Sequence, residues 1–396
     1  MKNTTLRIKK LVNLIQAYLD LLFLRDKPKA YPVELSLGTT SFCNLKCVQC
    51  PREGHDGNLT PYNEHLSMDY YRTMIPYLER ARQVYLYGLG EPMIDRKYFE
   101  KVRLVTSFGA EVALSSNGTL LDEKRCRETL DSGIQAIGIS LDASTPETFS
   151  VVRPPGGFEQ IVENLKRLVR MRNERGSNRP RILISFGIMQ QNLQDVVRFS
   201  DLGREIGVDE LIVHPVIYMS GKAEQELKVD EREVQRQVEI ARRKAEEYGI
   251  PFCYWDLDPM TFLNSLKFVR ENERNGHGSC SGIESQVQPE NGNGTEKQSQ
   301  LQPKQKYYCH FLWRNAMIQG HGELFPCCYM TNIKVGDIKN GNLRELRAHE
   351  KLASLRHAML TGNPPKPCQN CPQMLPYERW NIIKSGLKEI RGMLKW

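Results

Sequence analysis

The sequence has no long apolar run, no block of like charges, no internal repeat and no secretory-signal pattern. Lys and Arg (55) exceed Asp and Glu (47) by a net charge of +8, but the surplus is dispersed, so nucleic acid is not indicated as a partner. These absences leave a folded chain of 396 residues, which is long enough for one large α/β domain and a smaller second domain.

The most apolar segment near the start, residues 6–24, is too short and too interrupted to span a bilayer. It predicts an amphipathic helix within residues 1–31. We favour packing of this helix against the main domain, and contact with a membrane surface is the less favoured alternative.

Eleven cysteines without a secretory signal argue against a disulfide framework. Seven of them fall into two groups with metal-ligand spacing, which fits a reducing compartment, so we expect a cytoplasmic protein. Three others have no evident partner in the sequence, and these are Cys126, Cys253 and Cys280.

The first group occupies one short loop with C-x3-C-x2-C spacing, formed by Cys43, Cys47 and Cys50. Soft thiolate ligands select zinc, copper(I) or iron–sulfur clusters. Three thiolates around a four-iron cluster leave one iron open for chemistry. The alternatives are a zinc site without a nearby fourth ligand and three unrelated thiols.

From about residue 32 to 250, short β-prone runs alternate with helical patterns. This alternation predicts six βα units on a parallel sheet, with a further edge strand at 251–255. The expected strands are 33–39, 83–88, 111–116, 136–142, 181–188 and 210–217, and the expected helices are 69–81, 96–108, 122–132, 158–175, 192–206 and 230–248.

Unusual residues follow four of these strands: the cysteine loop, then 88–92, 116–118 and 140–142. Parallel α/β barrels and sheets place their active sites at the carboxyl ends of their strands. The sequence therefore predicts one functional face.

A change in composition marks residues 272–306, which are rich in Gly, Ser, Asn, Gln and Glu and predict a flexible linker. A compact unit at 307–375 and a helix at 376–396 are expected beyond it. The unit contains four candidate thiolate ligands, a set that also suits a zinc ribbon. They are Cys309, Cys327, Cys368 and Cys371, with Cys328 as the alternative to Cys327.

Together these motifs resemble the radical S-adenosylmethionine (SAM) superfamily. Four segments carry the resemblance: CNLKCVQC at 43–50, GLGEP at 88–92, SNG at 116–118 and SLD at 140–142. The second unit is similar to the auxiliary-cluster extension called SPASM, or to its shorter twitch form. The resemblance implies a partial (β/α)6 TIM-like barrel followed by a small α+β iron–sulfur domain.

The resemblance also implies the chemistry. Cys43, Cys47 and Cys50 would hold a [4Fe–4S] cluster whose fourth iron binds SAM, and one electron would cleave SAM to a 5′-deoxyadenosyl radical. Cys309, Cys327, Cys368 and Cys371 would hold one auxiliary [4Fe–4S] cluster. The electron donor would be a protein such as flavodoxin or ferredoxin.

Candidate SAM contacts follow from residue type. Gly88 and Gly90 allow close backbone approach, with Glu91 supporting the turn. Asn117, Ser140 and Asp142 carry short polar groups that suit the ribose hydroxyls or the methionine end of SAM. Asn117 also fits a plain turn, and Asp142 also fits a helix cap.

Two further residues are expected near the same face, and one residue differs from the family pattern. Arg153 would meet a carboxylate or tether its loop, and His214 is a core residue or a cavity residue. Gln49 stands where the family often has an aromatic residue, which leaves packing against the adenine open.

Two substrate classes fit. The first is a hydroxylated small molecule, such as a sugar or aminocyclitol, oxidised with the auxiliary cluster as electron acceptor. The second is a peptide or protein side chain. Only about thirty residues precede the first strand, which favours the small molecule. A non-catalytic iron–sulfur or zinc protein is the alternative of another class.

Overall fold

The computed structural model describes residues 2–50, 64–216, 228–254, 305–327, 330, 333–369, 371 and 374–394. Most of the expected linker, together with Cys280 and Cys328, lies outside these residues. None of the described helices is both long enough and apolar enough to cross a membrane.

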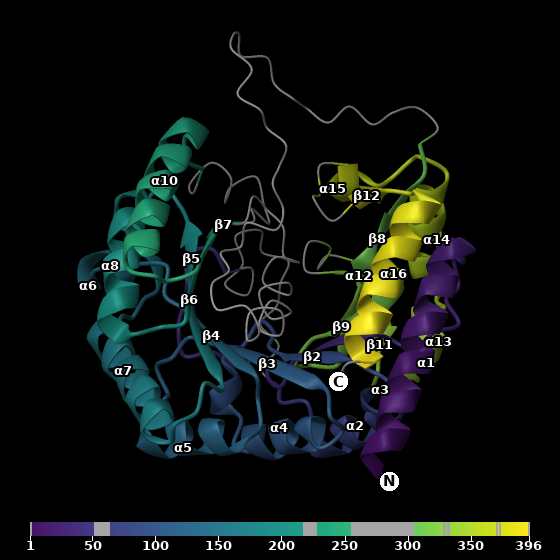
Figure 1. Ribbon diagram of the computed structural model, residues 1–396, viewed down its shortest axis with the longest axis horizontal. Coiled ribbons are helices and arrows are strands. Elements are labelled where there is room, and N and C mark those ends of the chain that lie inside the picture. Colours follow the sequence, from purple (N-terminus) through teal and green to yellow (C-terminus); the bar gives the residue numbers. More distant parts are fainter. Residues whose placement is uncertain are drawn as a thin grey trace.

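Seven parallel strands form an open, curved barrel wall in chain order, with helices on its outer side (Figure 1). The six predicted strands and the predicted edge strand are all present. They are β1 (Glu34–Leu37), β2 (Gln83–Leu86), β3 (Glu111–Ser116), β4 (Ala136–Ser140), β5 (Arg181–Ile188), β6 (Glu210–Pro215) and β7 (Phe252–Tyr254).

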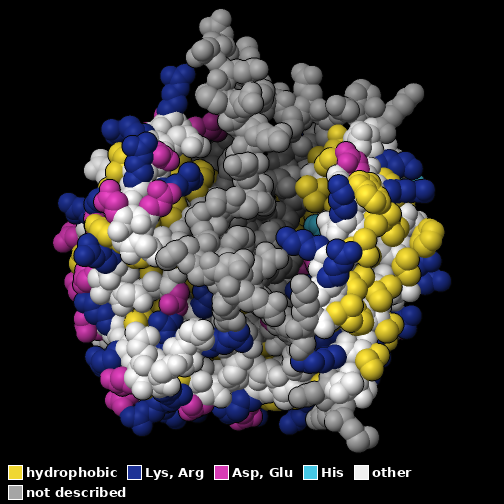
Figure 2. Space-filling model, in the orientation of Figure 1, with side chains coloured by type: hydrophobic (Ala, Val, Ile, Leu, Met, Phe, Trp, Pro, Cys, Tyr) yellow, Lys and Arg dark blue, Asp and Glu magenta, His cyan; other side chains and the backbone are white. Residues whose placement is uncertain are grey.

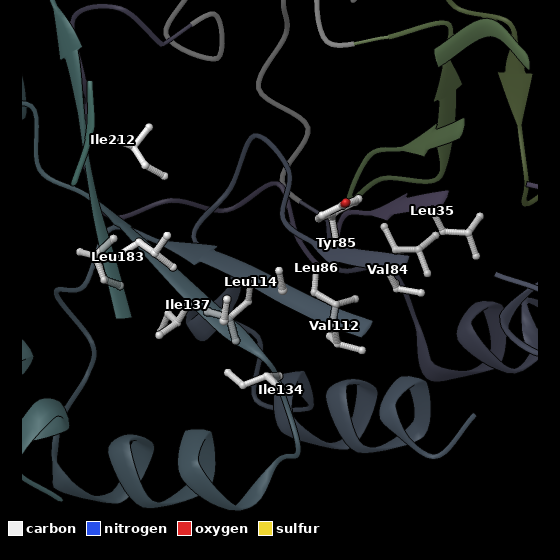
Figure 3. Close-up of a cluster of buried hydrophobic side chains, with 14 of the residues drawn as sticks. Leu35, Val84, Tyr85, Leu86, Val112, Leu114, Ile134, Ile137, Leu183 and Ile212 are labelled. Carbon is white, nitrogen blue, oxygen red and sulfur yellow. The ribbon is translucent and has the colours of Figure 1, made fainter. Parts of the chain in front are cut away.

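The wall is apolar because its strands are covered on both faces, as parallel sheets require. Side chains from neighbouring strands meet in one buried cluster, which includes Leu35, Val84, Leu114 and Ile137 (Figure 3). This continuous core fixes the register that carries the strand ends to one edge.

The predicted outer helices are present, and several begin at side-chain caps that the sequence displays. The Asp122 carboxylate accepts from the Arg125 N–H, and Asp230 does the same for Glu233, each satisfying an unpaired helix donor. The outer helices are α2 (Met68–Thr73), α3 (Ile75–Leu78), α4 (Tyr98–Thr106), α5 (Glu123–Asp131), α7 (Phe158–Glu174), α8 (Val196–Ile206) and α10 (Glu231–Glu247).

Two details differ from the sequence prediction. The single helix expected at 69–81 is divided into α2 and α3, with Pro76 in the first turn of α3. A short helix, α6 (Pro146–Val152), was not expected; Thr145 caps it by accepting from the Thr148 N–H. Two 3₁₀ turns, η2 (Pro92–Ile94) and η3 (Leu193–Asp195), complete this part.

The second unit continues the barrel sheet. Strand β9 (Asn315–Ile318) pairs in parallel with β1, and β10 (Glu323–Phe325) and β11 (Gly336–Asp337) follow antiparallel. Strands β9 and β10 form a hairpin around Gly320–Gly322, and the pairing of this hairpin with β1 was not predicted. The remaining elements are β8 (Tyr307–Cys309), α12 (His310–Arg314), α13 (Leu343–Arg347), α14 (Glu350–Leu360), α15 (Lys366–Gln369) and β12 (Met374–Pro376).

The first and last helices, α1 (Lys2–Leu22) and α16 (Arg379–Leu394), lie side by side and run in opposite directions on the outside of this second unit (Figure 1). Tyr18 packs against Gly386, and the Tyr377 hydroxyl donates to the Leu22 carbonyl. The N-terminal helix is therefore part of the folded body.

Candidate metal centre and its surroundings

The loop that carries Cys43, Cys47 and Cys50 follows β1 and is half-buried. Its backbone is held by the segment after α6: the Lys46 N–H donates to the Pro154 carbonyl at 2.8 Å, and the Val48 N–H donates to the Val152 carbonyl at 3.0 Å. A further bond, from the Cys50 N–H to the Cys47 carbonyl, closes a turn between two of the thiols. Backbone hydrogen bonds thus fix the loop, and the sequence motif does not indicate them.

The three thiols influence one another electrostatically. Burial raises the pKa of Cys47 to about 12, the Arg153 guanidinium opposes this shift, and Cys43 and Cys50 add to it. A buried thiol of this kind becomes a thiolate when a metal or a cation compensates its charge.

A buried ion pair links the cysteine loop to β4 and α6. The Asp142 carboxylate accepts from the Arg153 Nε at 2.8 Å and from the Gln49 Nε2 at 2.6 Å, and its other oxygen accepts from the Gly187 N–H at 2.6 Å. Asp142 has a positive φ of 55°, which aspartate tolerates better than most residues. Arg153 therefore pairs with Asp142, and Gln49 joins the same network. SAM contacts at Asp142 and Arg153 stay a prediction.

Glu91 is fully buried and organises the strand ends. Its carboxylate accepts from the Ser116 hydroxyl at 2.8 Å and from the Asn117 N–H at 2.6 Å, while its own N–H donates to the Phe42 carbonyl at 2.7 Å. Burial raises the pKa of Glu91, and these hydrogen bonds oppose the shift. Glu91 thus ties the GLGEP segment to the end of β3 and to the cysteine loop, and its role at the SAM site stays a prediction.

The two glycines of the GLGEP segment pack against protein backbone. A Cβ at Gly90 would lie 2.5 Å from the carbonyl oxygens of Thr40 and Phe42. A Cβ at Gly88 would lie 3.1 Å from the Gln319 Oε1 atom. Gly90 is thus required for the close approach of this segment to the cysteine loop.

The other strand-end residues take several positions. The Asn117 amide donates to the Asn44 side chain at 2.9 Å and points at the Cys43 sulfur at 3.9 Å. The Ser140 hydroxyl accepts from Ser185 at 3.4 Å. His214 Nδ1 lies 2.9 Å from the Pro215 carbonyl oxygen. SAM contacts at Asn117 and Ser140 stay a prediction.

The second group of cysteines also converges. Cys327 and Cys371 act electrostatically on both Cys309 and Cys368, and β12 pairs with β8 in the register that sets Met374 opposite Cys309. Burial raises the pKa of Cys368 to about 12 and that of Cys309 well above its usual range. The Phe311 and Leu312 N–H groups at the start of α12 oppose this rise in the pKa of Cys309.

Among the described residues, no three His, Cys, Asp or Glu side chains lie close enough to hold a single metal ion. A four-iron cluster binds its thiolates through different iron atoms, so its ligands are further apart than those of one ion. The donor types fit such clusters: three thiols beside a buried cation at one place, and four thiols at the other.

Sequence reasoning missed three residues of this region: Asn44, Gln49 as a hydrogen-bonding group, and Gln319. Gln319 lies in the turn after β9, is buried, and accepts from the Leu89 N–H at 3.3 Å, while its Nε2 has no partner among the described residues. In the sequence, only the adjacent glycine, Gly320, indicates that Gln319 lies in a tightly packed turn, because close backbone packing needs residues without a Cβ.

The fold and the two cysteine groups define an α/β barrel protein built around iron–sulfur chemistry. The family model "Radical SAM superfamily" matches residues 37–203, and the model SPASM, "Iron-sulfur cluster-binding domain", matches residues 309–372. The chain therefore carries a radical SAM domain and a C-terminal SPASM domain. These domains imply SAM and [4Fe–4S] clusters as cofactors.

Curated relatives match less than half of this chain. A tungsten-containing aldehyde ferredoxin oxidoreductase cofactor-modifying protein from Pyrococcus furiosus is 27% identical over 45% of this chain and 50% of its own length. An AdoMet-dependent heme synthase from Oleidesulfovibrio alaskensis is 30% identical over 32% of each chain. The chain thus spans half or less of the length of these relatives.

Solved structures resemble the chain more extensively. Streptococcus suis SuiB aligns with a TM-score of 0.59 at 14% identity, over 86% of this chain and 72% of SuiB. The anSMEcpe protein with bound AdoMet and Cp18Cys peptide aligns with a TM-score of 0.54 at 15% identity, over 91% of this chain and 96% of its own. At such identities the likeness shows the fold alone.

Proposed function

We propose that this chain uses a SAM-binding cluster and one auxiliary [4Fe–4S] cluster to oxidise a hydroxylated small molecule of the sugar or aminocyclitol type. When bound, SAM and its cluster supply a 5′-deoxyadenosyl radical that removes hydrogen from carbon. Cys43, Cys47 and Cys50 would hold the first cluster, and Cys309, Cys327, Cys368 and Cys371 the auxiliary one.

One observation carries the oxidation: the SPASM hairpin is joined to the strand that leads into the cysteine loop. β9 pairs with β1 along its whole length, and a Cβ at Gly320 would lie 2.2 Å from the carbonyl carbon of Thr40. Strand β10 of the same sheet ends at Phe325, two residues before the auxiliary cysteine Cys327. This connection between the two cysteine groups suits electron transfer from one to the other.

The proposed reaction balances. The hydrogen atom would leave with the deoxyadenosyl group, the hydroxyl proton would go to solvent, and a cluster held by Cys309, Cys327, Cys368 and Cys371 would accept the remaining electron. The substrate C–OH would become a C=O. A small protein donor such as flavodoxin or ferredoxin would supply the electron that starts each turnover.

The residues around the cysteine loop would tune the reduction potential of the first cluster. Arg153 provides a fixed positive charge beside Cys47 and Cys50, held by Asp142. Asn117 directs its amide at the Cys43 sulfur. Hydrogen bonds and nearby charge of this kind set the reduction potential of an iron–sulfur cluster.

Peptide modification is the second candidate. SuiB has been solved bound to the precursor peptide SuiA, and anSMEcpe with the peptides Kp18Cys and Cp18Cys. These neighbours align over 82% and 91% of this chain.

The test is substrate-dependent formation of 5′-deoxyadenosine by the anaerobically reconstituted, reduced full chain. Hydroxylated metabolites and peptides are screened in parallel, and the product is weighed by mass spectrometry. We expect a metabolite to stimulate the reaction and to lose the mass of two hydrogen atoms, with Cys43→Ala as the inactive control. A response to peptides alone would replace the small-molecule proposal, and no SAM cleavage would contradict both.

A further inference from the structure

An apolar surface covers the outer side of α1 and α16, and nothing in the described structure packs on it. Ten large hydrophobic side chains are exposed among the described residues, and eight of them lie here, between 37% and 69% exposed. We call this set the outer apolar stripe: Ile8, Val12, Ile15, Leu19, Phe23, Trp380, Leu387 and Leu394.

The stripe follows the helix periodicity. On α1 and the residue after it, the exposed positions from 8 to 23 recur at intervals of three and four, and every one of them is apolar. On α16 the apolar positions recur at intervals of seven. Because the helices run antiparallel, Trp380 lies at the same end as Phe23. The two rows therefore form one surface, visible over both helices in Figure 2.

The opposite side of α1 already supplies its contacts with the body. Leu14, Ala17 and Leu21 are buried there. Polar side chains of this helix also face inward: Lys10 donates to the Leu78 carbonyl, and Asn13 accepts from the Tyr31 N–H at 2.8 Å. Packing of the helix on the domain thus leaves the outer apolar stripe unused.

The exposed charges on the two helices have one sign. All exposed charged residues within the described side chains of the two helices are basic, namely Arg7, Arg379, Lys384, Lys388 and Arg391. Their acidic residues, Asp20 and Glu389, are turned inward and bound by Arg25 and Arg314. Two exposed acidic residues, Asp26 and Glu378, stand just beyond helix ends.

We propose that the outer apolar stripe seats the protein on an anionic membrane surface. An amphipathic face with apolar and aromatic side chains, flanked by Lys and Arg, inserts into the boundary between headgroups and acyl chains, and anionic lipids strengthen its binding. Trp380 has the amphipathic ring suited to this boundary, and the Lys384 ammonium lies 5.5 Å from its ring centre.

The same charges argue against a second copy as the occupant. A two-fold interface places the same patch against itself, so the basic residues of both copies would face one another. Juxtaposed like charges disfavour such a pairing. An anionic lipid surface satisfies both the apolar rows and their basic borders.

The test uses the full reconstituted chain in vesicle flotation, with phosphatidylcholine alone or mixed with phosphatidylglycerol. We expect preferential binding to the mixed vesicles that weakens with added salt. Val12→Gln with Leu19→Gln should lower the partition coefficient at least about tenfold. Lys384→Glu with Arg391→Glu should reduce binding to the mixed vesicles only.

Ile240→Gln on α10 is the matched control, because Ile240 and Leu19 have nearly equal exposure, 39% and 37%. It should bind vesicles like the wild type, and iron content should show that each variant is folded. Absence of vesicle binding, or equal loss in the control, would overturn the proposal. So would self-association in sedimentation that disappears in the stripe variant without vesicle binding. SAM cleavage without vesicles is a separate measurement and does not depend on this result.

Discussion

At the scale of single residues, the site depends on the absence of a side chain at Gly90. The GLGEP segment and the cysteine loop touch through backbone at Gly90, where even a methyl group would meet two carbonyl oxygens at 2.5 Å. Neither backbone can move without breaking the Glu91–Phe42 bond.

Gly90→Ala should therefore destabilise the protein by about 2 kcal/mol or more and lower iron incorporation. Chemical denaturation and iron analysis measure the two effects. The control is Gly392→Ala on α16, where no described atom lies within 4 Å of the added Cβ and no positive φ is required. That control should be neutral or stabilising by up to about 1 kcal/mol. Equal behaviour of the two variants would contradict the contact.

Substitutions of Asp142 and Arg153 should shift the reduction potential of the adjacent cluster in opposite directions. Arg153→Gln removes a buried cation near the thiols and should lower the reduction potential of the adjacent cluster, because the reduced cluster is the more negative state. Asp142→Asn should raise it, and asparagine tolerates the positive φ at this position. A redox titration followed by electron paramagnetic resonance compares them.

Each single variant should also lose about 3 kcal/mol of stability, because it leaves a buried charge without its partner. The double variant should recover part of that loss and return the potential toward the wild-type value. Shifts of the same sign in both single variants would show that Arg153 and Asp142 do not act through charge.

At the scale of elements, α1 combines a buried polar side with an exposed apolar one. Its Lys10 ammonium is 2% exposed and donates to the carbonyls of Leu78 and Ala81 at the end of α3 and just beyond it. Burial lowers the pKa of Lys10 to about 8. The charged form is thus less favoured in the folded than in the unfolded chain.

This shift predicts a pH effect on stability. Between pH 8 and 10.5 the unfolded chain holds the Lys10 proton and the folded chain does not, so stability rises with pH across that window. Relative to Lys10→Met, the wild type should gain about 3 kcal/mol over it. Urea unfolding of both proteins at pH 8 and 10.5 measures the difference, and parallel pH profiles would contradict it.

The elements also show where local sequence patterns are sufficient. All seven barrel strands were predictable because each is a short β-prone run bounded by turn residues. The hairpin β9–β10 was predictable from its glycines. Its pairing with β1 was not, because contact between segments far apart in the chain carries no local signal.

The same limit holds for the site. Cysteine spacing and the strand-end rule placed the cysteine loop and its face correctly. The bond from Gln49 to Asp142 and the contact of Gln319 with Leu89 arise only when separate βα units and the hairpin meet. Such side chains look like ordinary polar surface residues in the sequence.

At the scale of the whole molecule, one sheet joins the barrel to the second unit, and the two terminal helices pack on the outside of that unit. The SPASM hairpin makes β1 an interior strand of a ten-stranded sheet. The radical SAM domain and the auxiliary unit are therefore parts of one folded body.

The central claim is that the two cysteine groups hold separate clusters and that only the first one cleaves SAM. Its most direct test is iron content together with 5′-deoxyadenosine formation in the reduced full chain. The wild type should hold about eight irons and cleave SAM, while the triple variant Cys43→Ala, Cys47→Ala and Cys50→Ala should keep about four and be inactive. A triple variant that still cleaves SAM, or a wild type with about four irons and a zinc ion, would contradict the account.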